Sequence, residues 1–256
     1  MNDFTGKVVL ISGSAGGQGR YAALAFAKAG GKVVGCDVNV ERSKQTTQMV
    51  KDAGGDMVSI EPLDLSKPED SKKWIDLAIA TYGRIDVLYN NAAAVSHASF
   101  DAATIDDWDF TIRNELTICF SAAKAAWPHM KAQRSGVILN IASIQGHREL
   151  LLFPSAGHGA ASAAVLGLTR KIAVEGAPLG IRCVSISPGV VAHDNSAPPY
   201  NDASSPEMLA ICAPAPMKRA AHPREIVDVA MFLVSDKASY ITGVDLLVDG
   251  GMSAVI

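Results

Sequence analysis

The sequence predicts an α/β domain organised around a parallel β-sheet, and three observations support this fold class. Short apolar runs rich in β-branched residues alternate with longer segments of helical pattern along the chain. The first run, residues 8–11, is continuously apolar, as expected of a strand buried on both faces of a parallel sheet. The chain has 256 residues and 48% hydrophobic content, which is enough for one sizeable domain.

The first half of the chain predicts strands and helices in alternation, so that successive strands pair in parallel through right-handed crossovers. Glycines end the predicted helices, and Ser66 with Glu69 has the spacing of a capping box that opens the third helix. After the first strand, we expect strands over 32–36, 57–60 and 85–89, and helices over 19–29, 40–53 and about 67–82.

The second half begins with a long helical segment, 104–133, that is apolar over much of its circumference. Such a helix is expected to be buried against the sheet and also against another subunit. We expect further strands over 136–141, 181–186 and 244–248, and helices over about 158–175 and 224–234.

Residues 190–222 differ in composition from the rest, because several prolines interrupt any long helical pattern. We interpret this segment as a covering loop over a substrate, with a short helix near 206–211. A surface insertion of little order is the alternative. The sequence therefore predicts one domain over residues 1–256, with a covering substrate loop at about 190–222.

A glycine loop, Gly13 to Gly19, lies where the first strand is expected to turn into the first helix. Glycines allow the tight turn and let backbone N–H groups approach a pyrophosphate at the positive end of the helix. The second strand ends in Asp37, where a βαβ unit places a carboxylate against the adenosine ribose. Because a carboxylate accepts hydrogen bonds from the ribose hydroxyls and repels a 2′-phosphate, NAD is predicted in preference to NADP. A solvated acid at the strand end is the alternative for Asp37.

Charge and cysteine content narrow the partner and the compartment. The formal net charge is −3, and no run of lysine and arginine indicates a nucleic acid or an acidic membrane as partner. The four cysteines have no CxxC spacing, which favours buried free thiols in a reducing compartment. We see no apolar signal segment and no apolar run of the ~18 residues that a membrane span needs, so we expect a cytoplasmic protein.

Several motifs follow one another in order along the chain. They are the glycine loop, Asp64-Leu65, Asn90-Asn91-Ala92, Asn114, Ser143 within LNIASIQG, AAVLGLTR from Ala163, Pro188-Gly189 and the closing ITGVDLLVDGG. Together they resemble the short-chain dehydrogenase/reductase family over essentially the whole chain. The resemblance implies a single Rossmann-like, doubly wound domain with about seven parallel strands, helices on both faces and a homotetramer. It also implies a nicotinamide-dependent oxidoreductase that acts on a small molecule.

The resemblance assigns site residues one by one. For the dinucleotide it gives Gly13, Ser14, Gly17, Gln18, Gly19, Asp37, Asp64, Leu65, Asn90, Ala92, Pro188, Gly189 and Val191. The family's catalytic set is Asn, Ser, Tyr and Lys, with the last two spaced YxxxK, and Asn114 and Ser143 match its first two members. Where the tyrosine and lysine are expected, this chain has His158 and Ser162. The sequence thus resembles an atypical member that lacks both.

Replacing both residues together is chemically coherent. A phenol near pKa ~10 needs a neighbouring cation to exchange protons at neutral pH, whereas an imidazole near ~6.5 does not. A lysine beside His158 would disfavour the protonated ring, so the neutral Ser162, one helical turn away, suits an imidazole better. We therefore predict hydride transfer between NAD and a hydroxyl or carbonyl group, with His158 as the general acid/base and Ser143 donating a hydrogen bond to the reacting oxygen.

Two alternatives stay open, because histidine is shorter than tyrosine by roughly 2 Å and a ~1 Å misplacement can cost about 100-fold in rate. The chain could be a redox-neutral NAD-binding enzyme, or a non-catalytic nucleotide-binding subunit that assembles with a paralogue. In the family, the asparagine matched by Asn114 binds a water that relays protons, and without the lysine that relay lacks its next member.

Further side chains are expected near the substrate. His97, His147 and His193 lie in loops or element ends that the fold should bring near the same crevice. Arg148 either meets a polar substrate group or forms a surface ion pair. Because the histidines lack the HxxxH or HxH spacing of metal ligands, no metal is predicted. The apolar run 150–153 indicates a substrate with a hydrophobic body.

Overall fold

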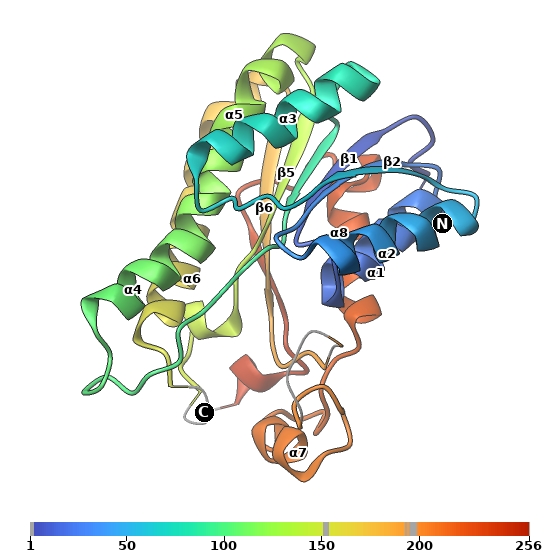
Figure 1. The fold of residues 1–256 in the computed structure, drawn as a ribbon. Coiled ribbons are helices and arrows are strands. Elements are labelled where there is room, and N and C mark those ends of the chain that lie inside the picture. The colour runs from blue at the N-terminus through green and yellow to red at the C-terminus, as the bar shows by residue number, and fades with distance from the viewer. Residues whose placement is uncertain (1–2, 151–153, 193, 195–198, 256) are drawn as a thin grey trace.

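The computed structural model describes residues 3–150, 154–192, 194 and 199–255. At its centre is a seven-stranded sheet in the order β3-β2-β1-β4-β5-β6-β7, with every neighbouring pair parallel (Figure 1). The strands are β1 (Val8–Ser12), β2 (Lys32–Cys36), β3 (Asp56–Ile60), β4 (Val87–Asn90), β5 (Gly136–Ile141), β6 (Ile181–Pro188) and β7 (Asp245–Val248). The predicted parallel sheet of about seven strands is confirmed.

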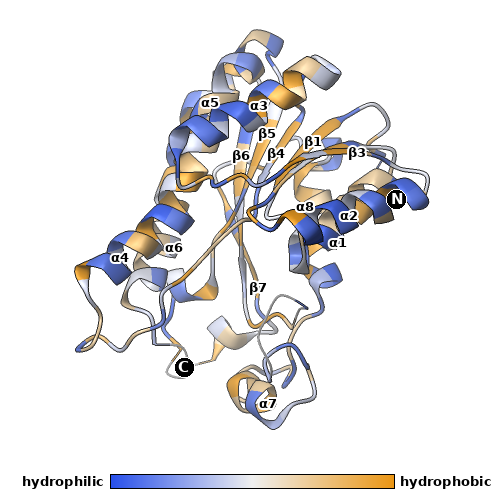
Figure 2. Ribbon diagram, viewed as in Figure 1, coloured by the Kyte–Doolittle hydropathy of each residue, from blue (hydrophilic) through white to orange (hydrophobic). Residues whose placement is uncertain are grey.

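Helices cover both faces of this sheet and bury two hydrophobic cores. One face carries α1 (Gly17–Lys28), α2 (Val40–Asp52) and α8 (Pro223–Val234), and the other carries α3 (Pro68–Tyr82), α4 (Ile105–Ile112), α5 (Ile118–Gln133) and α6 (Ala156–Gly176). Side chains alternate along β1, so Val8 and Leu10 enter one core while Val9 and Ile11 enter the other. Figure 2 shows the central strands as largely hydrophobic and α2 as largely hydrophilic. The chain is therefore doubly wound.

The four cysteines are free and buried, as predicted. Burial raises the pKa of Cys119 and of Cys183 to about 12, so both thiols stay protonated at neutral pH. Within the described ranges, no helix combines the length and the apolar character needed to cross a membrane.

The start of α3 differs from the prediction. Ser66 and Glu69 do not form a capping box, because the N-cap residue is Lys67 and no side chain there bonds to the first turn. Instead, the backbone N–H of Ser66 donates to the Asp64 carboxylate at 3.0 Å. The helix then begins at Pro68, whose fixed φ and missing N–H suit the first helical position.

The long helical segment predicted over 104–133 is present but is not uniformly α-helical. Between α4 and α5 lies a π-helical turn, Arg113–Thr117, in which the backbone is widened. The Thr104 side chain caps α4 in a reciprocal capping box with Asp107, and Asp107 also accepts a hydrogen bond from Ser96 at 2.6 Å. These contacts fix the loop before α4 against the helix that leads to the π-helical turn.

A buried polar network joins the central strands near their carboxyl ends. Asn90 on β4 donates to Asn140 on β5 at 2.8 Å, and Asn140 donates to Thr169 on α6 at 2.9 Å. The Ser12 hydroxyl at the end of β1 accepts from the backbone N–H groups of Asn91 and Ala92. Because buried polar groups are costly when unpaired, this network holds the strand ends in one arrangement.

The turn from β1 into α1 depends on two glycines. Gly13 has a φ of +68°, and its N–H donates to the carbonyl of Cys36 at 2.9 Å. A Cβ at Gly19 would lie 2.1 Å from the carbonyl oxygen of Gly13. The loop can therefore keep this path only without a side chain at Gly19.

We expect Gly19→Ala to destabilise the fold by roughly 1–3 kcal/mol, because the added methyl group forces the loop away from α1. Thermal unfolding followed by circular dichroism measures this change. Gly167→Ala is the matched control, since a Cβ at Gly167, inside α6, would meet no atom within 4 Å. That control should be neutral or stabilising by up to about 1 kcal/mol. Equal effects of the two substitutions would contradict the tight approach at Gly19.

Candidate active site

One large cavity, of about 1010 Å³, lies along the carboxyl ends of the strands. Parallel strands place all their carboxyl ends at the same edge of a sheet, and ligands of open α/β sheets bind there. The wall is completed by residues from the segment after β6, namely Val190, Val191, Tyr200 and Met208, the last from α7 (Pro206–Cys212). The segment predicted to cover a substrate therefore borders this cavity, and the predicted short helix is present.

Most of the residues predicted for the dinucleotide line the cavity. They are Gly13, Gly17, Gln18, Asp37, Asp64, Leu65, Ala92, Pro188, Gly189 and Val191. Ser14, Gly19 and Asn90 are buried behind this wall instead. Asn90 has its amide committed to Asn140, so it supports the wall and does not contact the cavity.

The Asp37 carboxylate fastens the glycine loop to the end of β2. One of its oxygens accepts from the backbone N–H of Ala15 at 2.9 Å, and the other accepts from Asn39 at 2.8 Å. Each carboxylate oxygen can accept more than one hydrogen bond, so the side chain retains acceptor capacity toward the cavity that it lines.

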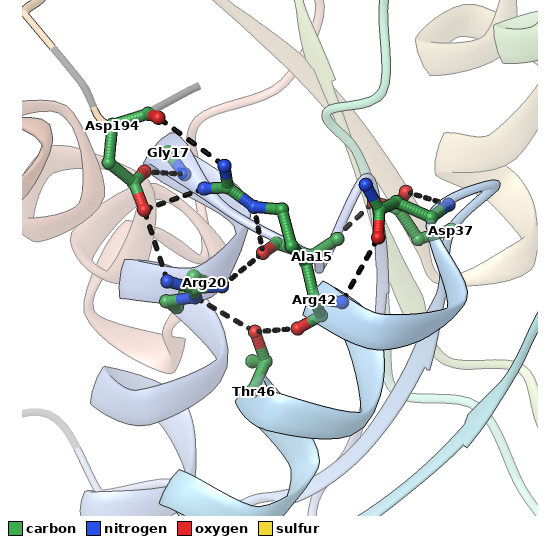
Figure 3. Close-up of polar contacts among 8 residues, drawn as sticks. Ala15, Gly17, Arg20, Asp37, Arg42, Thr46 and Asp194 are labelled. Atoms are coloured by element: carbon green, nitrogen blue, oxygen red, sulfur yellow. Dashed lines mark hydrogen bonds and ion pairs between the residues drawn. The ribbon is translucent and has the colours of Figure 1, made fainter. Parts of the chain in front are cut away.

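An anionic side chain already occupies the N-terminus of α1. Asp194, from the segment after β6, accepts from the backbone N–H of Gly17 at 2.8 Å (Figure 3). Its other carboxylate oxygen pairs with Arg20 at 3.0 Å and with Arg42 at 2.7 Å. The positive end of the helix and two guanidinium groups thus converge on one carboxylate, which shows that this corner binds an anionic group.

The same cavity contains the predicted catalytic residues. Ser143, Asn114, His158 and Ser162 all line it, although they come from three separate parts of the chain. The Ser143 hydroxyl accepts from the backbone N–H of Gln145 at 3.1 Å, which leaves its own proton available for donation. The Asn114 amide donates to the carbonyl of Phe110, one turn earlier in the helix.

Sequence reasoning missed Glu115, which pairs with His158. Its two carboxylate oxygens lie 2.7 and 2.8 Å from His158 Nδ1. Glu115 is 9% exposed, and burial raises the pKa of its carboxyl group, while the hydrogen bond from His158 and the nearby His97 act in the opposite direction. The available signal was an acid directly beside Asn114 in the helical segment.

The residues predicted near the substrate separate into two groups. His97 lines the cavity, whereas His147 and Arg148 are not part of its lining. His147 Nε2 lies 2.8 Å from the Asp245 carboxylate, and Arg148 donates to the carbonyl of Val255. Both side chains are therefore paired with residues that do not line the cavity.

Two of the predictions fall partly or wholly outside the described residues. His193 lies outside them, as do residues 151–153 of the predicted apolar wall. Leu150, the first residue of that wall, does line the cavity. Among the residues that are described, no three His, Cys, Asp or Glu side chains gather as a metal site would require.

Comparison with known proteins places the whole chain in one family. A family model described as enoyl-(acyl carrier protein) reductase matches residues 13–253. A 2,5-dichloro-2,5-cyclohexadiene-1,4-diol dehydrogenase of Sphingobium indicum is 34% identical over 255 residues, covering 98% of both chains.

Two solved structures agree along nearly their full length. A putative short-chain dehydrogenase/reductase from Burkholderia xenovorans superposes with a TM-score of 0.91 at 31% identity, covering 100% of both chains. A 7α-hydroxysteroid dehydrogenase, solved with NADH and 7-oxo glycochenodeoxycholic acid, has a TM-score of 0.89 at 27% identity, covering 97% of this chain and 95% of that one. The sheet, the cavity and these matches together show that the chain belongs to the short-chain dehydrogenase/reductase family of oxidoreductases.

Proposed function

We propose that this protein is an NAD-dependent oxidoreductase in which His158 is the general acid/base. The observation that carries the proposal is that His158, held by a buried carboxylate, lines the same cavity as Ser143 and the glycine loop. Proton exchange by a positioned imidazole typically contributes about 10²–10⁴-fold to a rate. The substrate is a hydroxyl or carbonyl compound, because hydride transfer to or from the nicotinamide interconverts these two oxidation states.

The corner around Gly17 fits a dinucleotide. The Gly17 N–H and two arginines already hold the Asp194 carboxylate, so their charges suit a pyrophosphate in the same place. Asp37, beside the loop, would take the ribose hydroxyls and disfavour a 2′-phosphate. When bound, the nicotinamide supplies the hydride acceptor or donor.

Around the reacting oxygen, the chain supplies a donor and a proton carrier. The Ser143 hydroxyl would donate a hydrogen bond to the substrate oxygen and polarise it. In the direction of alcohol oxidation, the hydroxyl proton passes to His158 as the C–H bond gives up its hydride. In the reverse direction, the protonated His158 gives its proton to the substrate oxygen as hydride reaches the carbonyl carbon. In either direction, the ring returns to its starting state by exchanging one proton with solvent before the next turnover.

The cavity wall favours a substrate with an apolar body. Leu150, Pro154, Val190 and Met208 contribute hydrophobic surface to the cavity. The names of the diol dehydrogenase and of the steroid dehydrogenase both describe alcohols on carbon rings. A cyclic or otherwise bulky secondary alcohol, or the matching ketone, is the substrate class that we propose.

We also propose a homotetramer in a reducing, cytoplasmic compartment, which the free thiols favour. Two separate surfaces carry exposed apolar side chains. Phe110, Phe120 and Val174 lie on α4, α5 and α6, and are 45%, 53% and 75% exposed. Leu246 and Leu247 on the edge strand β7 are 40% and 38% exposed. Two self-complementary surfaces generate a closed tetramer of two-fold symmetry.

Sedimentation of the purified chain should give the mass of four copies of the 26.8-kDa subunit. Phe120→Glu places charge on one of the two surfaces and should reduce the assembly to dimers. Glu41→Ala, on the exposed side of α2, is the control and should leave the tetramer intact. A monomeric wild-type protein at micromolar concentration would refute the tetramer.

Nucleotide titrations test the cofactor preference. We expect NAD and NADH to bind at least about tenfold more tightly than NADP and NADPH, since a like-charge contact with Asp37 costs several kcal/mol. Asp37→Ala should narrow this difference, while Asp52→Ala, on the surface of α2, should not. Tighter binding of NADP would instead indicate that Arg42, whose Nε donates to Ala15, recognises the 2′-phosphate.

A His158→Ala variant tests the acid/base assignment. Turnover of a secondary alcohol should fall about 10²-fold or more, while the Kd for NAD stays within about twofold of wild type. His129→Ala, on α5 and outside the cavity lining, should retain activity. Wild-type turnover in the His158 variant would refute the assignment, and substrate conversion without a net change in nicotinamide absorbance would indicate redox-neutral chemistry.

A further inference from the structure

The buried Glu115 and the half-buried His158 form a pair that links two elements 43 residues apart in sequence. The side chain of Glu115 is 9% exposed and that of His158 is 20% exposed. Both carboxylate oxygens lie within 2.8 Å of the same ring nitrogen, Nδ1. Glu115 therefore contacts one ring nitrogen and leaves the other, Nε2, out of the pair.

This geometry decides which ring nitrogen carries the proton. A carboxylate can only accept, so the short contacts require a proton on Nδ1 whenever the pair is hydrogen-bonded. In the neutral ring, Nε2 is then unprotonated and has a free lone pair. Without Glu115, the carboxylate that places the proton on Nδ1 would be lost.

We infer that Glu115 is a positioning residue that holds His158 in the Nδ1–H tautomer, so that Nε2 is the atom that exchanges the proton with the substrate oxygen. The inference rests on the proposed function of His158. In alcohol oxidation the proton of the substrate hydroxyl moves to Nε2, and the ring becomes an imidazolium with both nitrogens protonated. The Glu115 carboxylate stays charged and lies against that cation through Nδ1.

The backbone accounts for how Glu115 reaches His158. Residues next to each other in an α-helix point about 100° apart, yet Asn114 and Glu115 both line the cavity. They lie in the π-helical turn between α4 and α5, where the extra residue per turn alters the directions of the side chains. The π-helical turn therefore allows Glu115 as well as Asn114 to face the cavity.

A purely structural ion pair is the competing explanation, because any buried carboxylate needs a partner. The two explanations differ in what Glu115→Gln does. The substitution keeps the size of the side chain but removes its charge, and its amide group can donate to Nδ1 and thereby reverse the tautomer. If the pair is only structural, Glu115→Gln changes the thermal stability of the protein, and the tautomer of His158 has no effect on turnover.

The first measurement is the tautomer itself, by nitrogen-15 NMR of the histidine rings without any nucleotide. The His158 signals are assigned by their loss in His158→Gln. At a pH where the ring is neutral, wild type should show a protonated Nδ1 and an unprotonated Nε2. Glu115→Gln should shift the ring toward the opposite tautomer. A wild-type ring protonated on Nε2, or one unaffected by Glu115→Gln, would overturn the inference.

The second measurement is kinetic and uses the full chain with NAD and a secondary alcohol. Glu115→Gln should lower kcat by roughly 10²–10⁴-fold, with KM and the Kd for NAD within about twofold of wild type. Glu115→Asp, which restores a carboxylate, should recover part of the loss. Glu175→Gln is the matched control, because Glu175 is an exposed acid on α6 paired with Lys171.

The outcomes separate this inference from the function on which it rests. Unchanged kcat in a folded Glu115→Gln variant, alongside a large loss in His158→Ala, would overturn the role of Glu115 and leave the proposed function intact. If wild type oxidises or reduces no substrate, the proposed function fails, and the NMR tautomer alone decides whether Glu115 sets the protonation of the ring. A fall in thermal stability without a change of tautomer would identify the pair as structural.

Discussion

The parallel pairing of all seven strands is the constraint on which the rest of the structure depends. It brings the ends of β1, β2, β4, β5 and β6 to one edge, and residues distant in sequence meet there in one cavity. Parallel strands buried on both faces cannot slide without exposing apolar side chains, so their register is firmly set. The hydrogen bonds from Asn90 to Asn140 and from Asn140 to Thr169 fix the same edge from inside.

The Glu115–His158 pair in the cavity combines an anion with a group that becomes a cation, whereas the tyrosine and lysine of the family pattern combine a cation with a group that becomes an anion. A phenol becomes an anion when it gives up its proton, and a neighbouring cation stabilises that state. An imidazole becomes a cation when it takes up a proton, and Glu115 supplies the matching anion. The neutral Ser162 also suits this arrangement, because a lysine in its place would oppose the imidazolium.

Much of the fold was predictable from sequence, because buried parallel strands are continuously apolar and glycines mark the ends of their helices. The residues that follow each strand and line the cavity were predictable as well, because each stands directly after an apolar run in the sequence. The capping box at Ser66 was not correct, because local spacing does not reveal that Pro68 already fixes the helix start. Glu115 and Asp194 were missed because their partners lie 43 and 177 residues away, and the pattern around each residue carries no trace of those contacts.

The carboxylate of Asp194 has a consequence for how the proposed nucleotide site would respond to its surroundings. Arg20, Arg42 and the N-terminus of α1 would repel one another if left without an anion, and Asp194 acts as their built-in counterion. A pyrophosphate that took the Gly17 N–H would therefore exchange one anion for another. Because the exchange releases few ions from solution, the affinity of this site for a dinucleotide should depend on ionic strength less steeply than its two arginines alone would suggest.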